Sequence, residues 1–257
     1  MDEGTRKNLS RSNGVLWPPD DLPPQQCSPE LRRHVLTLVP YFVGLSEQDL
    51  EGVHSAFNAR HMLKGTTLVA AGDPAETLFV IVSGRVKLVA NDAEGNDHVL
   101  DVRGPGDSFG ALPILGQASN EHRVEALTGG CVLVTSTAEF GDLVTSFPSV
   151  AVAVLEDVSR RLREAQGRLQ AATSSSVEAR LAATLLTLSA RFGTDTPDGR
   201  TLGVPLSQEE LAALVGSTLE SVNRVLASWR RGGLVITGRL KVTLARPDEL
   251  AHIAGRS

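Results

Sequence analysis

Polar and apolar positions between residues 205 and 226 follow the period of two short amphipathic helices. The apolar positions form one stripe on each helix: Leu211, Ala212 and Val215 on the first, and Val222, Val225 and Leu226 on the second. Gly216 lies between the stripes, where glycine permits the left-handed backbone of a tight turn. Two segments, Ser207-x-x-Glu210 and Ser217-x-x-Glu220, fit the capping box that begins helices. The pattern predicts a helix-turn-helix, with an ordinary helical hairpin as the alternative.

Two β-branched, apolar-rich runs follow these helices, at 234–236 and 240–244, on either side of Thr237-Gly238-Arg239. Such runs around a short glycine-containing segment predict a hairpin packed beside the second helix, which makes a winged helix. Residues 203–246 hold six Lys or Arg against three Asp or Glu, whereas the whole chain has a net charge of −5. Positive charge is therefore concentrated where DNA phosphates would lie.

The segment from residue 62 to about 134 has a different pattern, with short β-type runs punctuated by glycine. The runs are Thr66–Val69, Leu78–Val82, Arg85–Val89, His98–Val102 and Cys131–Val134. Strands at this regular spacing predict a sandwich or barrel. Helical turns are expected before them, around Leu45–Leu50, where Ser46 is the predicted N-cap.

A long helix is predicted after Pro148, because apolar residues recur there at spacings of three and four. The seam that they form contains Leu155, Val158, Leu162, Ala165 and Leu169. It predicts a homodimer, since helix-turn-helix proteins normally read DNA in pairs; packing of the helix on its own barrel is the alternative. After a hinge at 171–176, Ser175 and Glu178 are predicted to cap a helix over 177–192.

These patterns together predict an α+β protein with more than one domain, as the length of 257 residues also suggests. Residues 1–30 are polar and rich in proline, so we expect a disordered or extended tail there. The predicted parts that follow are the barrel domain at 31–148, the dimerisation helix and hinge at 149–173, and the winged helix-turn-helix at 174–257.

Composition argues against several classes of protein. No apolar run reaches the ~18 to 20 residues that cross a bilayer, and the polar N-terminus lacks a signal-peptide core, so a cytoplasmic protein without membrane contact is expected. The two cysteines, Cys27 and Cys131, are too few for a disulfide scaffold and are expected as buried or incidental thiols. No nucleophile–base pair or metal-ligand spacing stands out, so we expect neither an enzyme nor a metal site.

The order of these parts resembles the bacterial cyclic-AMP receptor and fumarate–nitrate regulator (CRP/FNR) family of transcription factors, from about residue 31 to 247. The segment Gly72–Leu88 is similar to the family's first cyclic-nucleotide-domain signature, and Gly104–Gly110 looks like the entry to its phosphate-binding cassette. The resemblance implies a jelly-roll barrel that holds an effector. It also implies a homodimer that binds a two-fold symmetric operator, with RNA polymerase as a further candidate partner.

The cassette departs from the family's nucleotide sensors at the positions that hold cyclic AMP. Ala111 stands where those sensors have a Glu for the ribose. Their Arg and Ser or Thr for the phosphate fall on Glu121 and His122, or on Asn120 and Glu121 in a second alignment, and a carboxylate there would repel a phosphate. On the long helix Ala165-Gln166 replaces the base-binding Thr-Ser. We therefore expect an effector other than cyclic AMP, or none.

Cyclic di-GMP and haem stay open as effectors. Arginines suit cyclic di-GMP, and Arg85, Arg123, Arg161 and Arg163 are candidates by their expected proximity. A haem needs a strong axial ligand, for which His34, His54, His61, His98 and His122 are present but in no distinctive motif. Two cysteines argue against a four-cysteine iron–sulfur cluster. The candidate pocket consists of Arg85, Gly110, Ala111, Leu112, Glu121, His122, Arg123, Arg161 and Gln166.

The resemblance gives the DNA-contacting residues more definite roles. Glu220 and Arg224 match the family's base-reading pair, with Arg donating to guanine and Glu accepting from cytosine. Leu219 replaces a further Arg and can contact only a thymine methyl group or pack. Other predicted DNA contacts are Ser207, Gln208, Thr218, Asn223 and Arg239, of which Ser207, Thr218 and Arg239 are assigned to phosphates. The alternative is a winged helix that binds another protein.

Overall fold

The structure, a computed structural model, describes residues 10–12, 15–17, 27–92, 95, 97–110 and 116–255, with the side chains before residue 27 and at 172–174 excepted. The chain forms two compact units, one made of residues 1–90 and 102–161 and the other of 91–101 and 162–257. Within the described ranges no single helix is long and apolar enough to cross a membrane. Among these residues, only the pair of helices Thr137–Ser146 and Pro148–Ala171, bent by 116° relative to each other, has together the length and apolar composition of a membrane span.

Two four-stranded sheets form the predicted barrel, in the strand orders β3-β10-β5-β8 and β4-β9-β6-β7. Their strands are β3 (Asn58–Met62), β4 (Thr67–Val69), β5 (Thr77–Ser83), β6 (Val86–Asn91), β7 (Asp97–Arg103), β8 (Ser108–Phe109), β9 (Arg123–Ala126) and β10 (Gly130–Ser136). Strand β5 is buried on both faces: Phe79 and Ile81 point into the barrel core, while Leu78 and Val80 face the helices. This double burial explains why the strand is apolar throughout rather than alternating.

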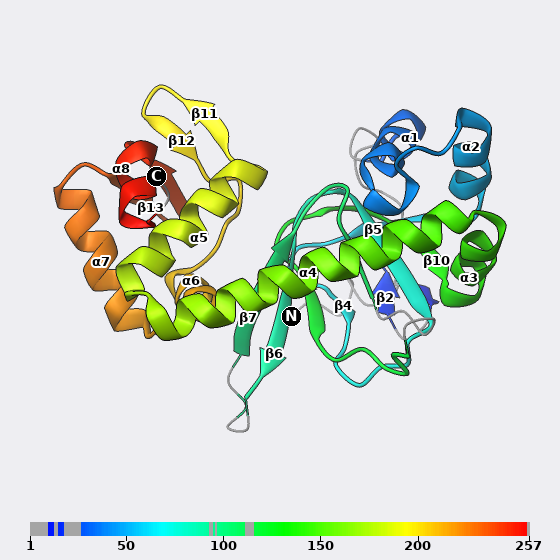
Figure 1. Cartoon of the computed structure of the whole chain (residues 1–257), viewed down its shortest axis with the longest axis horizontal. Helices are drawn as coiled ribbons and strands as arrows, with labels where there is room; N and C mark the ends of the chain where they lie inside the picture. Colours follow the sequence, from blue (N-terminus) through cyan, green and yellow to red (C-terminus); the bar gives the residue numbers. More distant parts are fainter. Residues whose placement is uncertain are drawn as a thin grey trace. The chain divides into compact units, whose positions relative to one another are not determined.

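Helices cover the outer face of β5 and β10 in the first unit (Figure 1). They are α1 (Pro29–Leu38), the 3₁₀ helix η3 (Pro40–Phe42), α2 (Glu47–Ser55), α3 (Thr137–Ser146) and the start of α4 (Pro148–Ser174). Ser46 caps α2 as predicted, with its Oγ accepting from the Asp49 N–H at 3.2 Å. The long helix begins at Pro148 and continues to Ser174, so the first four residues of the hinge predicted at 171–176 are helical instead. Val150 and Val154 anchor its first turns in the core.

Two findings concern the segment predicted as a tail. Ser10–Ser12 (β1) and Val15–Trp17 (β2) pair as antiparallel strands. Cys27 is buried and forms a disulfide with Cys131 of β10, with the two Cα atoms 5.6 Å apart. The prediction of two free thiols is therefore wrong. The cysteines are 104 residues apart, and they meet because α1 packs against the sheet that contains β10.

The second unit contains the predicted winged helix-turn-helix. Its elements are α5 (Val177–Phe192), β11 (Thr194–Thr196), β12 (Gly199–Thr201), α6 (Gln208–Val215), α7 (Leu219–Arg231), β13 (Val235–Gly238), β14 (Lys241–Leu244) and α8 (Pro247–Ile253). The four strands form one sheet in the order β11-β12-β14-β13. The wing turn is Arg239-Leu240, slightly later than the predicted centre at Gly238, and Leu240 has a left-handed φ of 54°.

Two of the three predicted capping boxes are wrong. Ser207 and Glu210 do form one at the start of α6. Helix α5 is instead capped by Ser176, whose Oγ accepts from the Ala179 N–H, and α7 is capped by Thr218, whose Oγ1 accepts from the Ser221 N–H. Neighbouring hydroxyl residues compete for one cap, and the backbone path rather than the Ser-x-x-Glu spacing decides between them.

Candidate DNA-binding face and effector pocket

The turn between α6 and α7 depends on Gly216, which has φ 66° and ψ 50°. Its N–H bonds back to the carbonyls of Ala212 and Ala213, a left-handed end that a side chain would strain. At the other end of α6, the Ser207 Oγ accepts from the Glu210 N–H at 3.0 Å, while the Glu210 carboxylate accepts from the Ser207 N–H at 2.8 Å. Both ends of this short helix are therefore fixed locally.

Helix α7 buries Val222, Leu226 and Trp229 and turns its charged positions outward. Glu220 and Arg224, the predicted base readers, form an ion pair of 3.1 Å with side chains 85% and 74% exposed. Glu220 thus pairs within the helix, rather than forming the predicted capping box. Asn223 is half-buried, and its Oδ1 is shielded from solvent without a hydrogen-bond partner among the described residues. The sequence had predicted that Asn223 faces the DNA.

A groove of ≈ 390 Å³ lies between the start of α6, the start of α7 and the wing. Ser207 and Gln208 line it from α6, Leu219 from α7, and Arg239 and Lys241 from the wing. Four of these five residues belong to the predicted DNA-binding set, and the structure adds Lys241. Glu209 contributes a carboxylate to the same groove. Two cations and the N-terminus of a helix suit an anionic strand in this position.

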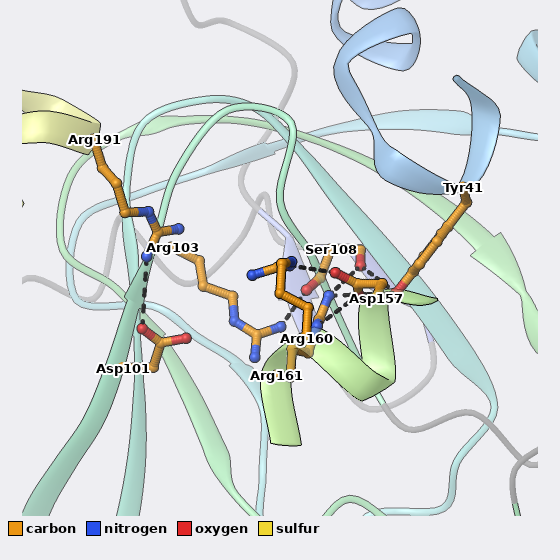
Figure 2. A network of polar contacts seen from close by, with 8 residues as sticks. All are labelled: Tyr41, Asp101, Arg103, Ser108, Asp157, Arg160, Arg161 and Arg191. Carbon is orange, nitrogen blue, oxygen red and sulfur yellow. Dashed lines mark hydrogen bonds and ion pairs between the residues drawn. The ribbon is translucent and has the colours of Figure 1, made fainter. Parts of the chain in front are cut away.

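In the first unit, Arg161 of the predicted pocket lies in a buried polar network, which Figure 2 shows. Arg161 Nε is 2.6 Å from Asp157 Oδ2, and its Nη2 donates to Ser108 Oγ at 3.1 Å and to the Tyr41 hydroxyl at 3.3 Å. The Tyr41 hydroxyl donates to Asp157 Oδ2 at 3.1 Å and accepts from Ser108 at 2.9 Å. Arg160 also contacts Asp157. The network therefore joins η3, β8 and α4.

The charges in this network set its protonation. Burial alone would raise the pKa of Asp157, but Arg161 and Arg160 outweigh burial and hold that pKa below its ordinary value. Burial raises the pKa of Tyr41, and the Asp157 carboxylate adds to this effect. Asp157 is therefore ionised and the Tyr41 hydroxyl is protonated at neutral pH. An anionic ligand at Arg161 would have to compete with the chain's own carboxylate.

The contacts of the other predicted pocket residues are local ones. Gly110 has φ 104°, and a Cβ there would overlap the Thr77 carbonyl oxygen, so the backbone path requires glycine. Ala111 and Leu112 lie outside the described residues. Arg85 donates to the Gly84 carbonyl at 2.7 Å, and Arg123 is 3.9 Å from Glu125.

The two cassette alignments put the family's phosphate-binding positions on Glu121 and His122, or on Asn120 and Glu121. Asn120 is buried and donates to the carbonyls of Asp73 and Pro74, which is a structural role. Glu121 is exposed, while the Nδ1 of His122 is buried without a partner among the described residues. On α4, Gln166 is exposed.

The predicted dimer seam is an apolar stripe open to solvent on this chain. Its exposed fractions are 58% for Leu155, 38% for Val158, 57% for Leu162 and 70% for Leu169, and Ala165 is exposed as well. The structure adds Val152, at 56%, to the same helix. Large apolar side chains exposed at heptad spacing are typical of a helix that packs against a second helix.

Comparisons with known proteins agree with both halves of this description. The family model of the cyclic nucleotide-binding domain matches residues 59–147, and that of the Crp-like helix-turn-helix domain matches residues 179–253. The "Cyclic AMP receptor protein" of Thermus thermophilus is 30% identical over 218 residues, which is 84% of this chain and 96% of the relative. The chain therefore belongs to the CRP/FNR family of transcription regulators.

Two further similar proteins also match over most of both chains. The "CRP-like cAMP-activated global transcriptional regulator" of Mycobacterium tuberculosis is 27% identical over 86% of this chain and 98% of its own length. Among solved structures, a CRP-family transcriptional regulator, also from Thermus thermophilus, is 27% identical, with a TM-score of 0.65 over 76% of this chain and 96% of that one. The family, the α+β fold and DNA binding as a transcription regulator, all expected from the sequence, are thus confirmed.

Sequence reasoning missed Tyr41, Ser108 and Asp157 of the network. A local signal existed only for Asp157, which precedes Arg160 and Arg161 by three and four residues, the spacing of ion pairs on one helix face. Tyr41 is the chain's sole tyrosine, but nothing near it in sequence indicates a partner on α4.

Proposed function

We propose that this regulator acts as a homodimer on a two-fold symmetric DNA operator in the cytoplasm. The observation that carries the proposal is the exposed Glu220–Arg224 pair at the start of α7, beside a groove that Arg239 and Lys241 line. A short helix that presents an acceptor and a forked donor suits a C·G or G·C step in the major groove. The two wing cations suit the neighbouring phosphates.

The exposed stripe on α4 supports the homodimer. Fully burying one Leu or Val side chain stabilises by about 1.5 to 3 kcal/mol as an upper estimate, and a second copy supplies an identical stripe of Leu155, Val158, Leu162 and Leu169. A two-fold pair of winged helices also meets the need to contact two half-sites about one DNA turn apart.

The contacts of Arg161 support an effector other than cyclic AMP, or none. Asp157, Ser108 and Tyr41 already occupy Arg161, and Glu121 carries a negative charge in the cassette. Two relatives are named for cyclic AMP, whereas Ala111, Glu121 and Gln166 of this chain depart from the pattern of the family's nucleotide sensors. Cyclic di-GMP is the ligand to titrate beside cyclic AMP, because arginines suit its phosphates.

The experiment compares Arg224→Ala with Arg239→Ala on an operator selected from random DNA. Arg224→Ala should relax specificity at one guanine and lose about 1 to 3 kcal/mol on the selected site only. Arg239→Ala should weaken selected and random DNA alike and make binding less dependent on salt. Arg33→Ala, which removes an exposed arginine of α1 in the first unit, is the matched control and should change neither. Equal losses on both kinds of DNA for Arg224→Ala and Arg239→Ala would refute the role of Arg224.

A further inference from the structure

A single arginine, Arg180 in the first turn of α5, contacts two separate parts of the second unit. Its Nη1 donates to the Ser175 carbonyl at 2.7 Å, its Nε to the Val215 carbonyl at 3.1 Å, and its Nη2 to the Gly216 carbonyl at 3.1 Å. All three nitrogens of the guanidinium are therefore engaged with backbone oxygens.

These carbonyls lie at two connections between helices, which we call the joints of the unit: the one from α4 to α5 and the one from α6 to α7. Ser175 directly follows α4, and its N–H still bonds to the Ala171 carbonyl in helical fashion, so it moves with the end of that helix. Val215 ends α6, and Gly216 forms the turn before α7. The last carbonyls of a helix have no partner within it, which makes them strong acceptors at the negative end of the helix dipole.

The planar guanidinium fixes the directions of these three hydrogen bonds relative to one another. The end of α4 and the turn before α7 are therefore held in one mutual geometry by one rigid group. A lysine at this position has a single nitrogen and cannot bridge the two joints in the same way.

A neighbouring contact holds the other end of α7. The Trp229 indole N–H donates to Glu178 Oε1 at 2.8 Å, and Trp229 is 3% exposed. Glu178 and Arg180 lie in the same turn of α5, so this turn holds α7 at both ends.

We propose that Arg180 is a positioning residue that sets the orientation of α7 relative to the end of α4. The proposal rests on the proposed function, because α4 is there the helix that pairs in the dimer. If α4 defines the two-fold axis, the angle that Arg180 fixes determines the distance between the two copies of α7. The residue then specifies the half-site spacing that the protein accepts, without touching DNA.

The test measures the binding of full-length Arg180→Met, Arg180→Lys and wild-type protein to three operators: one with the selected spacing, and two with the centre one base pair shorter or longer. Isolated half-site DNA is the fourth probe. Arg180→Met should lose about tenfold on the selected spacing, keep half-site affinity within about twofold, and bind the three spacings almost equally. Arg180→Lys should fall between Met and wild type.

Arg200→Met is the matched control. Arg200 Nε donates to the Ser189 carbonyl at 3.1 Å near the far end of α5, so its loss removes an arginine–carbonyl contact that involves neither joint. It should lower the melting temperature and leave the spacing preference unchanged. If Arg180→Met or Arg180→Lys also kept the wild-type spacing preference, the proposal would be overturned, whatever stability the variant lost. Equal losses of affinity for half-site and full-operator DNA would overturn it as well. Failure of the proposed function would give a different result: the wild-type protein would be monomeric, or it would show no preference among the three operator spacings.

Discussion

Replacing Asp157 by Asn tests the buried network of α4 directly. The Asp157 side chain is 0% exposed, whereas Arg160 and Arg161 are 46% and 32% exposed. The substitution removes the negative charge of Asp157 and leaves the Arg161 guanidinium beside the Tyr41 and Ser108 hydroxyls. Removing one partner of a buried ion pair costs about 3 to 5 kcal/mol. Because both arginines keep partial contact with water, we expect about 3 kcal/mol, the lower end of that range.

Urea unfolding followed by circular dichroism measures this loss as a shift of the midpoint. Glu51→Gln is the matched control, since Glu51 forms a 3.3 Å ion pair with Arg33 in which the side chains are 62% and 55% exposed. An exposed pair contributes about 0 to 1 kcal/mol, so the control should barely move the midpoint. The double variant Asp157→Leu, Arg161→Met should recover much of the loss, because apolar residues need no counter-charge. A loss for Asp157→Asn no larger than for Glu51→Gln would refute the reasoning.

Three further predictions concern pH, assembly and ligand. The folded-state pKa of Asp157 is lowered, so the contribution of its carboxylate to stability is fully present above the unfolded pKa of about 3.9 and is lost as pH falls through the folded pKa. The stability difference between wild type and Asp157→Asn should therefore shrink as pH drops below about 4. A difference that stays constant would contradict the lowered pKa. Leu162→Glu should place a charge in the α4 seam and give monomers in analytical ultracentrifugation. A variant that stays dimeric would mean that the dimer interface lies outside the seam. Calorimetry should detect no micromolar binding of cyclic AMP, because each missing hydrogen bond weakens binding by about 1 to 3 kcal/mol; micromolar binding coupled to tighter operator binding would reverse that expectation.

The local parts of the DNA-binding unit were predictable because their signals are short-range. The apolar stripes around Gly216 gave two helices at nearly their observed positions, since a 3.6-residue period specifies which face is buried. The wing was predicted as a hairpin, but its turn lies at Arg239-Leu240 rather than around Gly238. A glycine favours a left-handed turn, yet strand register can move the turn onto a leucine when both strands are held by their neighbours.

The effector unit shows the limit of such signals. Glycine-punctuated strands predicted a barrel. Of the helices that cover it, the sequence indicated α2, through its cap at Ser46, and the long helix α4, but neither α1 nor α3. The predicted pocket, however, was a list of residues in separate segments. Arg161, one of them, lies in a network with Tyr41, Ser108 and Asp157, which the list did not contain. Those partners were missed because burial and hydrogen bonding, which select them, are properties of the packed chain.

The sequence by itself determined the order of barrel, long helix and winged helix-turn-helix, and with it the family, because each part is encoded by residues within a few turns or strands of one another. It also determined the apolar stripe of α4, which follows from heptad spacing, whereas the exposure of that stripe is seen in the structure. Only the tertiary structure decided that Tyr41 meets Asp157 across 116 residues, or that Arg180 reaches Gly216 across 36. Contacts of that separation form when packed elements bring distant carbonyls and charges together, and no local period records which ones will meet.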